Sequence, residues 1–363
     1  MSSPRITALH ARAVRAPFNR PPVSASGAIE AAALVLIDLE TDAGLTGRCY
    51  LFAFSEAMLK ATVTCLEGLA PLVVGQAVEP FALDRSLRQR FRLLDCHGIL
   101  GQALAGLDMA AWDIHAQAAN LPLALMLGAD ARPIPAYNSC GLWVQAPDTL
   151  ADEATALLDD GRFQALKMRI GRADFNADLA AVRAVRERLD DSVLLMSDFN
   201  QSLTVNEALA RGRALEDEGL YWIEEPVRHD DFDGCARIST ALSTPVQIGE
   251  NLRSAAEMQQ AIAAHAASFY MPDVQRIGGV SGWMKAATLA EVHSLDLSSH
   301  LFPEISVHLL AASPTCHWLE YVDWANPILA EPLVIENGHA LIPARPGNGI
   351  TWDEAAIARY ALG

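Results

Sequence analysis

The fold is decided by residues 194–250, where three short apolar runs each end in a carboxylate: Leu194-Leu195-Met196-Ser197-Asp198, Tyr221-Trp222-Ile223-Glu224 and Val246-Gln247-Ile248-Gly249-Glu250. The acids are evenly spaced, because 26 positions lead from each one to the next. Segments with helical patterning lie between the runs, so the local pattern is strand, acid, helix, repeated. Right-handed crossovers make successive strands parallel neighbours. The three acids are therefore expected side by side at the carboxyl edge of one sheet.

Three carboxylates on adjacent strands repel one another unless a cation lies between them. An all-oxygen set of ligands suits a hard divalent ion that keeps some of its water, which favours Mg²⁺. Asp198, Glu224 and Glu250 therefore predict a magnesium site. The alternative is three unrelated surface acids, each at the end of its own strand.

The alternation of strands and helical segments continues on both sides of this stretch. The expected strands are residues 134–140, 165–169, 194–198, 221–225, 246–250, 269–273, 297–300 and 317–320. Eight strands with seven intervening segments predict an α/β fold, a modified (β/α)7β barrel of the TIM type. The active site of such a barrel lies at the carboxyl ends of its strands.

The pattern divides the chain into three parts. Residues 1–130 predict an α+β capping domain, with three antiparallel strands followed by three helices, and residues 131–320 predict the barrel. Residues 321–363 contain four prolines and few periodic apolar positions, so this segment is expected to fold back on the capping domain. The breaker-rich stretch 19–27 joins the first two strands and predicts either a loose surface loop or a mobile lid.

Composition limits the possible partners. The chain has 363 residues and a formal net charge of −17, which disfavours nucleic acid and anionic membranes as partners. Its six cysteines are far apart and lack zinc-type spacing, which fits a reducing, cytoplasmic environment. Residues 1–18 lack the apolar core of a signal peptide, and no apolar run is long enough to cross a bilayer. A small molecule is the expected partner, and an anionic one must be attracted by local positive charge.

Polar residues also end the remaining strands. Lys167 and Arg169 are two positions apart and share one face of their strand. Asp273, His300 and Glu320 end the sixth, seventh and eighth strands, so they are expected to join the ring of carboxylates. Other residues near the strand ends, Ser139 and Asn200, are expected to lie close to the bound ligand.

Together these segments resemble the enolase superfamily, in its mandelate racemase subgroup. The similar segments are 50–54, 108–113, 166–171, 198–203, 222–226, 249–251, 271–280, 298–306 and 317–320. The resemblance implies that Asp198, Glu224 and Glu250 bind Mg²⁺, with Asn200 near the metal and the substrate. It also implies a homo-oligomer, commonly an octamer.

By the same resemblance, His300 is a general base paired with Asp273, a combination that the superfamily uses with magnesium. Glu320 is an acid hydrogen-bonded to the substrate carboxylate, and Lys167 neutralises that carboxylate. The physical demand agrees, because removing a proton next to a carboxylate produces an enediolate with two negative oxygens. A metal ion, a buried cation and a hydrogen-bond donor stabilise that charge without reorganising.

Arg169 departs from the family pattern, in which a lysine at this position is the second base. Arginine stays protonated, with a pKa above about 12. The expected function is a racemase or epimerase of a 2-hydroxy acid in which Arg169 serves as acid and base. The alternative is a dehydratase of acid sugars (aldonates or aldarates) with His300 as the main acid and base and Arg169 as an anion binder, and the remote alternative is a protein that only binds a carboxylate. The apolar segment 51–54 favours an apolar substrate substituent, unless it belongs to the domain interface.

Overall fold

The computed structural model describes residues 3–25 and 27–362. The capping domain begins with a three-stranded antiparallel sheet of β1 (Ile6–Pro17), β4 (Ala31–Thr41) and β5 (Thr46–Phe52), in the order β1-β4-β5. Helices α1 (Glu56–Val73), α2 (Pro80–Arg90) and α3 (Gly98–Ala118) follow, and the short α4 (Leu123–Met126) ends the domain. The expected order of three antiparallel strands followed by three longer helices is confirmed.

Segment 19–27 is not simply a loop. It contains the two-residue strands β2 (Val23–Ser24) and β3 (Gly27–Ala28), which pair as a small antiparallel hairpin. Val144 N donates to Val23 O at 2.8 Å, and Trp143 Nε1 donates to Arg20 O at 3.2 Å, so the segment is attached to the loop that follows the first barrel strand.

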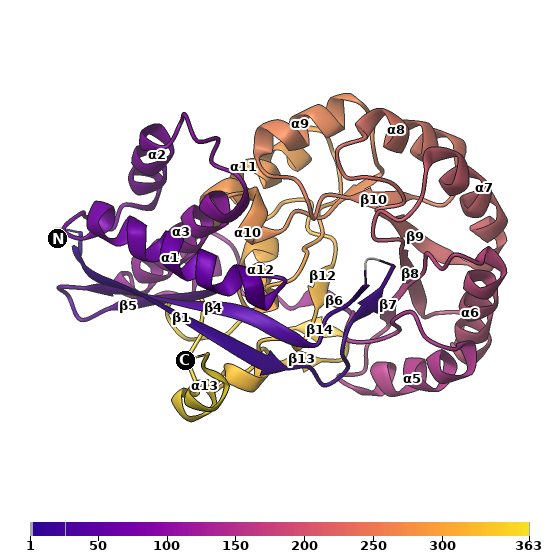
Figure 1. Cartoon of the computed structure of the whole chain (residues 1–363), viewed down its shortest axis with the longest axis horizontal. Helices are drawn as coiled ribbons and strands as arrows, with labels where there is room; N and C mark the ends of the chain where they lie inside the picture. Colours follow the sequence, from indigo (N-terminus) through magenta and orange to yellow (C-terminus); the bar gives the residue numbers. More distant parts are fainter. Residues whose placement is uncertain (1–2, 26, 363) are drawn as a thin grey trace.

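The barrel confirms the predicted fold class (Figure 1). Its parallel strands are β6 (Ile134–Asn138), β7 (Ala165–Arg169), β8 (Leu194–Asp198), β9 (Leu220–Glu224), β10 (Val246–Ile248), β11 (Phe269–Tyr270) and β12 (Leu319–Tyr321), with β12 paired to β6. The outer helices are α5 (Pro147–Asp159), α6 (Phe175–Arg188), α7 (Val205–Leu215) with the 3-10 turn η1 (Glu216–Glu218), α8 (Phe232–Ala241), α9 (Ala255–Ala263), α10 (Val274–Ile277), α11 (Gly279–Val292) and α12 (Pro303–Ala311).

The seventh strand, expected at 297–300, forms single bridges instead of a continuous ladder. Leu297 bridges to Tyr270 and to Cys316, and His300 bridges to Asp273. Pro272 lies between the bridged positions of the sixth strand and has no N–H to donate, which interrupts the pairing. The prediction of a continuous seventh strand was therefore wrong. Residues 297 and 300 still bridge the neighbouring segments.

The C-terminal segment contacts both domains. It contains η2 (Asn326–Ile328), the hairpin strands β13 (Ile335–Glu336) and β14 (His339–Ala340), and α13 (Glu354–Tyr360). Trp352 Nε1 donates to Asp38 Oδ1 of the capping domain at 2.8 Å, whereas β14 pairs antiparallel with β6 of the barrel. Across residues 3–25 and 27–362, none of the helices combines the length and apolar content that crossing a bilayer requires.

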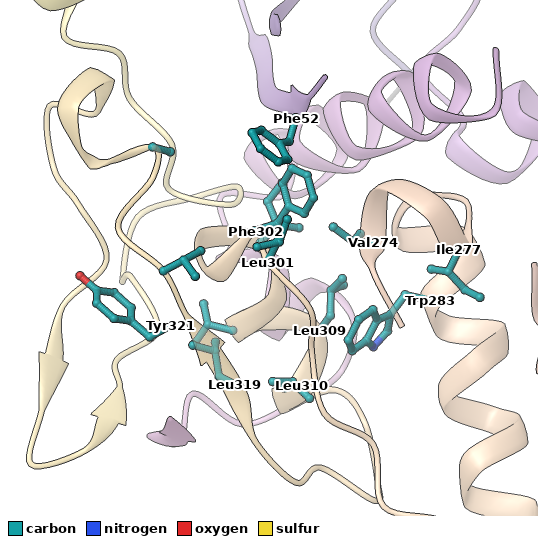
Figure 2. Close-up of a cluster of buried hydrophobic side chains, with 14 of the residues drawn as sticks. Phe52, Val274, Ile277, Trp283, Leu301, Phe302, Leu309, Leu310, Leu319 and Tyr321 are labelled. Carbon is teal, nitrogen blue, oxygen red and sulfur yellow. The ribbon is translucent and has the colours of Figure 1, made fainter. Parts of the chain in front are cut away.

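One apolar core runs through the domain interface. Phe52, from the end of β5, lies over Phe302 and Leu301 of the barrel, with Leu309, Leu310 and Trp283 beneath them (Figure 2). A second cluster of Tyr137, Ala165, Met196 and Trp222 fills the barrel interior. Side chains therefore fill the barrel interior, whereas most of the capping domain lies beside the barrel (Figure 1).

Candidate active site

The three predicted metal ligands meet at one point. Asp198 ends β8, Glu224 ends β9, and Glu250 follows β10. The parallel register places Asp198 opposite Glu224, and one carboxylate oxygen from each of the three residues lies within 4.8 Å of the others. Gly249, at φ 138°, brings its backbone so close to Met271 that a Cβ would lie 2.7 Å from Met271 N. The even spacing in the sequence thus becomes a real cluster.

This cluster suits a divalent cation in charge and in donor type. Burial, and then repulsion between the neighbouring carboxylates, raises the pKa of Glu224 to about 8, and burial also raises the pKa of Asp198. Asn200 holds both oxygens of Asp198, with N–H donating at 2.7 Å and Nδ2 at 2.9 Å. A Mg²⁺ ion between three oxygen donors would keep all three ionised, so the residues fit this metal.

Lys167 lies beneath the cluster and is fully buried. Its Nζ donates to Glu224 Oε1 at 2.5 Å and lies 2.8 Å from Glu320 Oε1 and 3.7 Å from Asp198 Oδ2. Burial alone would lower the pKa of Lys167, but Glu224 and Glu320 outweigh it and the pKa is raised. Lys167 is therefore a buried cation that is ion-paired with Glu224 and Glu320.

His300 faces the cluster from the other side of the mouth. Its Nδ1–H donates to Asp273 Oδ2 at 2.8 Å, and its Nε2 lies 3.4 Å from Glu250 Oε2. Burial lowers the pKa of His300, but the nearby carboxylates of Glu250 and Asp273 outweigh burial, and the net effect raises the pKa from 6.5 to about 9. A cation that neutralises Glu250 would remove the strongest of these raising effects, so the imidazole would become available as a base near neutral pH.

Glu320 accepts three hydrogen bonds and is fully buried. The donors are Ser139 Oγ at 2.7 Å, Leu301 N at 2.9 Å and Lys167 Nζ at 2.8 Å. Burial raises the pKa of Glu320, but Lys167 and His300 reverse that effect and hold the pKa below its usual range. The Ser139 hydroxyl, expected beside the substrate, is thus engaged by Glu320.

Arg169 is held between several partners. Its Nη1 donates to Ser139 O at 3.3 Å, its Nε lies 3.8 Å from Asp198 Oδ2, and its Nη2 lies 3.7 Å from Glu320 Oε1. The guanidinium also stacks over the Trp143 ring at 4.3 Å. These contacts suit an anchored cation that binds anions.

A cavity of about 270 Å³ opens over the cluster and contains the predicted residues Arg169, Asp198, Asn200, Glu250 and His300 in its wall. Behind that wall lie Lys167, Asp273, Glu320 and Ser139, which contact the lining residues Asp198, His300, Leu301 and Arg169 respectively. Ser24, Gly27 and Ile29 also line the cavity, so the 19–27 segment lies over the site.

Sequence reasoning proposed the apolar segment that contains Phe54 as a substrate contact, but it did not identify four other residues of the cavity wall: Trp143, Trp324, Gln201 and Leu301. Most of them lie in irregular segments, where periodicity gives no signal. Trp143 offered one indirect signal, since it follows the first barrel strand by only a few residues. The wall therefore combines aromatic side chains with a linked polar group, in which Gln201 and Asn251 donate to Glu225 and Arg276 donates to Asn251.

The comparisons with known proteins agree with this geometry. A model of the mandelate racemase / muconate lactonizing enzyme N-terminal domain matches residues 6–128, and the enolase C-terminal domain-like family matches residues 149–356. A Bradyrhizobium enolase, solved with magnesium and mandelic acid, is 40% identical, with a TM-score of 0.96 and full coverage of both chains.

Two curated relatives are enzymes that act on sugar acids. The L-talarate/galactarate dehydratase of Salmonella typhimurium is 36% identical over 259 residues, which are 71% of this chain and 65% of that enzyme, so the match spans just under two thirds of the relative. The 3,6-anhydro-alpha-L-galactonate cycloisomerase of Streptomyces coelicolor is 32% identical over 346 residues, which are 94% of each protein.

Magnesium is bound in close structural neighbours, and Asp198, Glu224 and Glu250 form the metal site of this chain. The chain belongs to the enolase superfamily, in the group of mandelate racemase and muconate lactonizing enzyme.

Proposed function

We propose that this enzyme removes the α-proton of a small 2-hydroxy carboxylate, with His300 as the base and Mg²⁺ at Asp198, Glu224 and Glu250. One observation carries the proposal: His300 Nε2 lies 3.4 Å from a metal-ligand oxygen while Asp273 holds its Nδ1 at 2.8 Å. A substrate carboxylate next to the metal would therefore present its α-carbon to the imidazole. Such a base is held in the correct tautomer by its acidic partner.

The charge that develops in the reaction has fixed partners in the site. Magnesium supplies positive charge for the carboxylate oxygens of the substrate when it is bound. Lys167, buried and ion-paired with Glu224 and Glu320, adds a second cation at the same place. Glu320 can donate a hydrogen bond to the substrate only if it takes up a proton, because its neighbours hold its pKa low. The negative charge of the substrate carboxylate, once it is bound next to Glu320, would favour the uptake of this proton by Glu320.

Dehydration is the outcome that the site supports best. Among the described residues that line the cavity, His300 is the one nitrogen base that can lose its proton near neutral pH, since Arg169 and Arg276 are guanidinium groups. In a dehydration, His300 takes the α-proton, the electron pair forms the enediolate, and the β C–O bond breaks. The same imidazole returns the proton to the leaving hydroxide as water, and the enol becomes a 2-keto acid.

A hydroxylated substrate suits the polar group of the wall, because Gln201, Asn251 and Arg276 lie together around Glu225 and offer amide and guanidinium groups to the cavity. The curated relative of Salmonella typhimurium that dehydrates talarate and galactarate supports the same substrate class. We therefore infer an aldonate or aldarate as the substrate of this reaction.

Racemisation of a 2-hydroxy acid with an apolar substituent is the second candidate. The aromatic residues of the cavity wall favour it, namely Phe54, Trp143 and Trp324. The Bradyrhizobium structure with mandelic acid supports the same substrate class. This outcome requires Arg169 to exchange a proton on the face opposite His300.

One experiment separates these candidates. The magnesium-loaded enzyme is incubated in heavy water with sugar acids and with aryl or alkyl 2-hydroxy acids, and NMR follows the α-proton. Release of a 2-keto acid indicates dehydration, and loss of the α-proton with inversion indicates racemisation. Binding without any proton exchange over the whole panel would leave only the third function, a protein that binds carboxylates without catalysis.

A further inference from the structure

Gln275 is a fully buried polar residue of α10, two positions after Asp273. Its side-chain amide pairs with both backbone groups of one residue of the capping domain. Gln275 Oε1 accepts from Phe52 N at 2.7 Å, and Gln275 Nε2 donates to Phe52 O at 3.2 Å. The amide thus takes the place of a neighbouring strand for the last residue of β5, and it joins the two domains.

The same residue is bonded to the acid that holds His300. Gln275 N donates to Asp273 Oδ1 at 2.7 Å, while Asp273 Oδ2 accepts from His300 Nδ1 at 2.8 Å. The two oxygens of Asp273 are therefore held by α10 on one side and by the proposed base on the other. Gln275 consequently connects to His300 through its main chain and to the capping domain through its side chain.

Beyond Phe52 the capping chain enters the cavity wall. Phe54 lines the cavity, its ring centroid lies 4.4 Å from that of Phe52, and the Arg276 guanidinium lies 4.8 Å over the ring. The backbone of Phe54 is left-handed, at φ 59°. A bulky residue keeps such a conformation only where its surroundings fix it. The pairing of Phe52 with Gln275 provides part of that fixation.

Apolar side chains surround the pairing of Phe52 with Gln275. Figure 2 shows Phe52 above Phe302 and Leu301, with Val274, the residue before Gln275, on the barrel side. Both backbone groups of Phe52 are buried there, so they cannot turn to water when the amide is removed. Restoring a partner would require the end of β5 or the start of α10 to move, and Asp273 begins α10.

We propose that Gln275 is a positioning residue, which couples the docking of the capping domain to the geometry of the Asp273–His300 pair. The inference rests on the function proposed above, because it assigns His300 the role of base. A positioning role for Gln275 differs from a purely structural role in its effect on catalysis. Loss of the amide should slow proton transfer itself, rather than only weaken the contact between the domains.

The test compares three variants in the magnesium-loaded, full-length enzyme. Gln275→Met keeps the length of the side chain and removes both hydrogen bonds, and Gln275→Asn keeps an amide that is one methylene too short to reach both groups of Phe52. The matched control is Ser281→Ala on α11, which removes a hydroxyl that accepts from Trp112 Nε1 at 2.9 Å and donates to Asp108 Oδ1 at 2.6 Å across the same domain interface.

We expect kcat for α-proton exchange to fall about tenfold or more in Gln275→Met, since small displacements of a catalytic group have effects of this order. KM should change much less, and the amide of Phe52 should exchange with solvent faster. Ser281→Ala should lower Tm with kcat unchanged. If Gln275→Met does not fold, the same comparison is made with Gln275→Asn, for which we expect a smaller fall in kcat.

Two negative results are distinguishable. If the wild-type enzyme exchanges no α-proton in the panel, the proposed function is wrong, and this inference falls with it. If the wild type is active and the variant at Gln275 loses only Tm, as Ser281→Ala does, then the inference alone is overturned and the amide is merely structural.

Discussion

The two sides of the barrel mouth hold their functional groups by different means. On the metal side, β8 and β9 form a parallel ladder that sets Asp198 directly opposite Glu224. On the side of the base, His300 belongs to a segment with single bridges, and its partner Asp273 begins a short helix bonded to the capping domain. The first arrangement follows from strand geometry alone. The second depends on contacts between distant parts of the chain.

The largest effect should come from the metal side. Glu224→Gln removes one ligand charge, and we expect it to abolish magnesium binding and to lower the rate of α-proton exchange about 10⁴-fold or more, because the metal contributes several kcal/mol to charge stabilisation. Isothermal titration with Mg²⁺ and exchange in heavy water measure the two effects. A chelator should act in the same way on the wild type.

Glu225→Gln is the matched control, because Glu225 is also a buried acid but hydrogen-bonds to Asn251 and Gln201 outside the predicted set of ligands. It should retain magnesium binding. Turnover that survives the chelator would contradict the metal site as the centre of the reaction.

On the other side, His300→Asn should lower α-proton exchange about 10³-fold, within the range for general acid–base groups, and leave magnesium binding intact. The asparagine can still donate a hydrogen bond toward Asp273, so the backbone should keep its course. Heavy-water exchange and titration calorimetry on the same preparation test both parts. Exchange at the wild-type rate would mean that another group is the base.

Asp273→Asn should have a smaller effect, about 10- to 100-fold on kcat, because it acts through the orientation and charge of His300. Removal of the carboxylate also removes one of the groups that raise the pKa of His300. The acidic limb of the activity–pH profile should therefore move to lower pH. An unchanged profile would show that Asp273 does not control the protonation of the base.

This contrast between the two sides explains how far the sequence alone could reach. The acids at 198 and 224 end parallel strands and Glu250 lies two residues beyond the next one, so spacing was enough to predict their meeting at one edge. The roles of Lys167 and Glu320 came from the family resemblance, and they remain proposals. The seventh strand was predicted as regular, and it is not, because Pro272 breaks the ladder on its neighbour.

The parts that sequence reasoning did not reach depend on tertiary contacts. Gln275 lies in a four-residue helix, where nothing in the local pattern predicts an amide paired with Phe52, more than two hundred residues earlier. Trp324 comes from the C-terminal segment and contacts Phe52 with ring centroids 5.1 Å apart. Such residues enter the wall through long-range packing, which periodicity does not encode.

Arg169→Lys tests whether a second base can exchange a proton on the face of the substrate opposite His300. Lysine can lose its proton where arginine cannot, so we expect the inverted product to rise several-fold, about tenfold at most. Chiral chromatography of a 2-hydroxy acid after incubation measures inversion, and Arg169→Gln serves as the control without a base. Equal inversion in both variants would show that the second base is not what limits the reaction.

The smallest effect should be a dependence of stability on pH and magnesium, which compares the two sides in one measurement. The folded-state pKa of Glu224 is raised from 4.5 to about 8, and that of His300 from 6.5 to about 9. A raised pKa means that the stabilising contribution is present below the unfolded value and is lost as pH rises through the folded value. The metal-free protein should therefore lose stability between about pH 4.5 and pH 8 through Glu224, and between about pH 6.5 and pH 9 through His300.

Magnesium binds the ionised carboxylates, so it competes with the protons of the metal side and its stabilising effect should increase over the same interval. We expect the gain in Tm on adding Mg²⁺ to be larger at pH 9 than at pH 6.5 by a few degrees, about 3 °C. Glu224→Gln should abolish the gain, whereas His300→Asn should keep it and flatten only the fall of the metal-free protein above pH 6.5. An equal gain at both pH values would mean that protons do not occupy the metal side, and that the neighbouring cation Lys167 already keeps its carboxylates ionised.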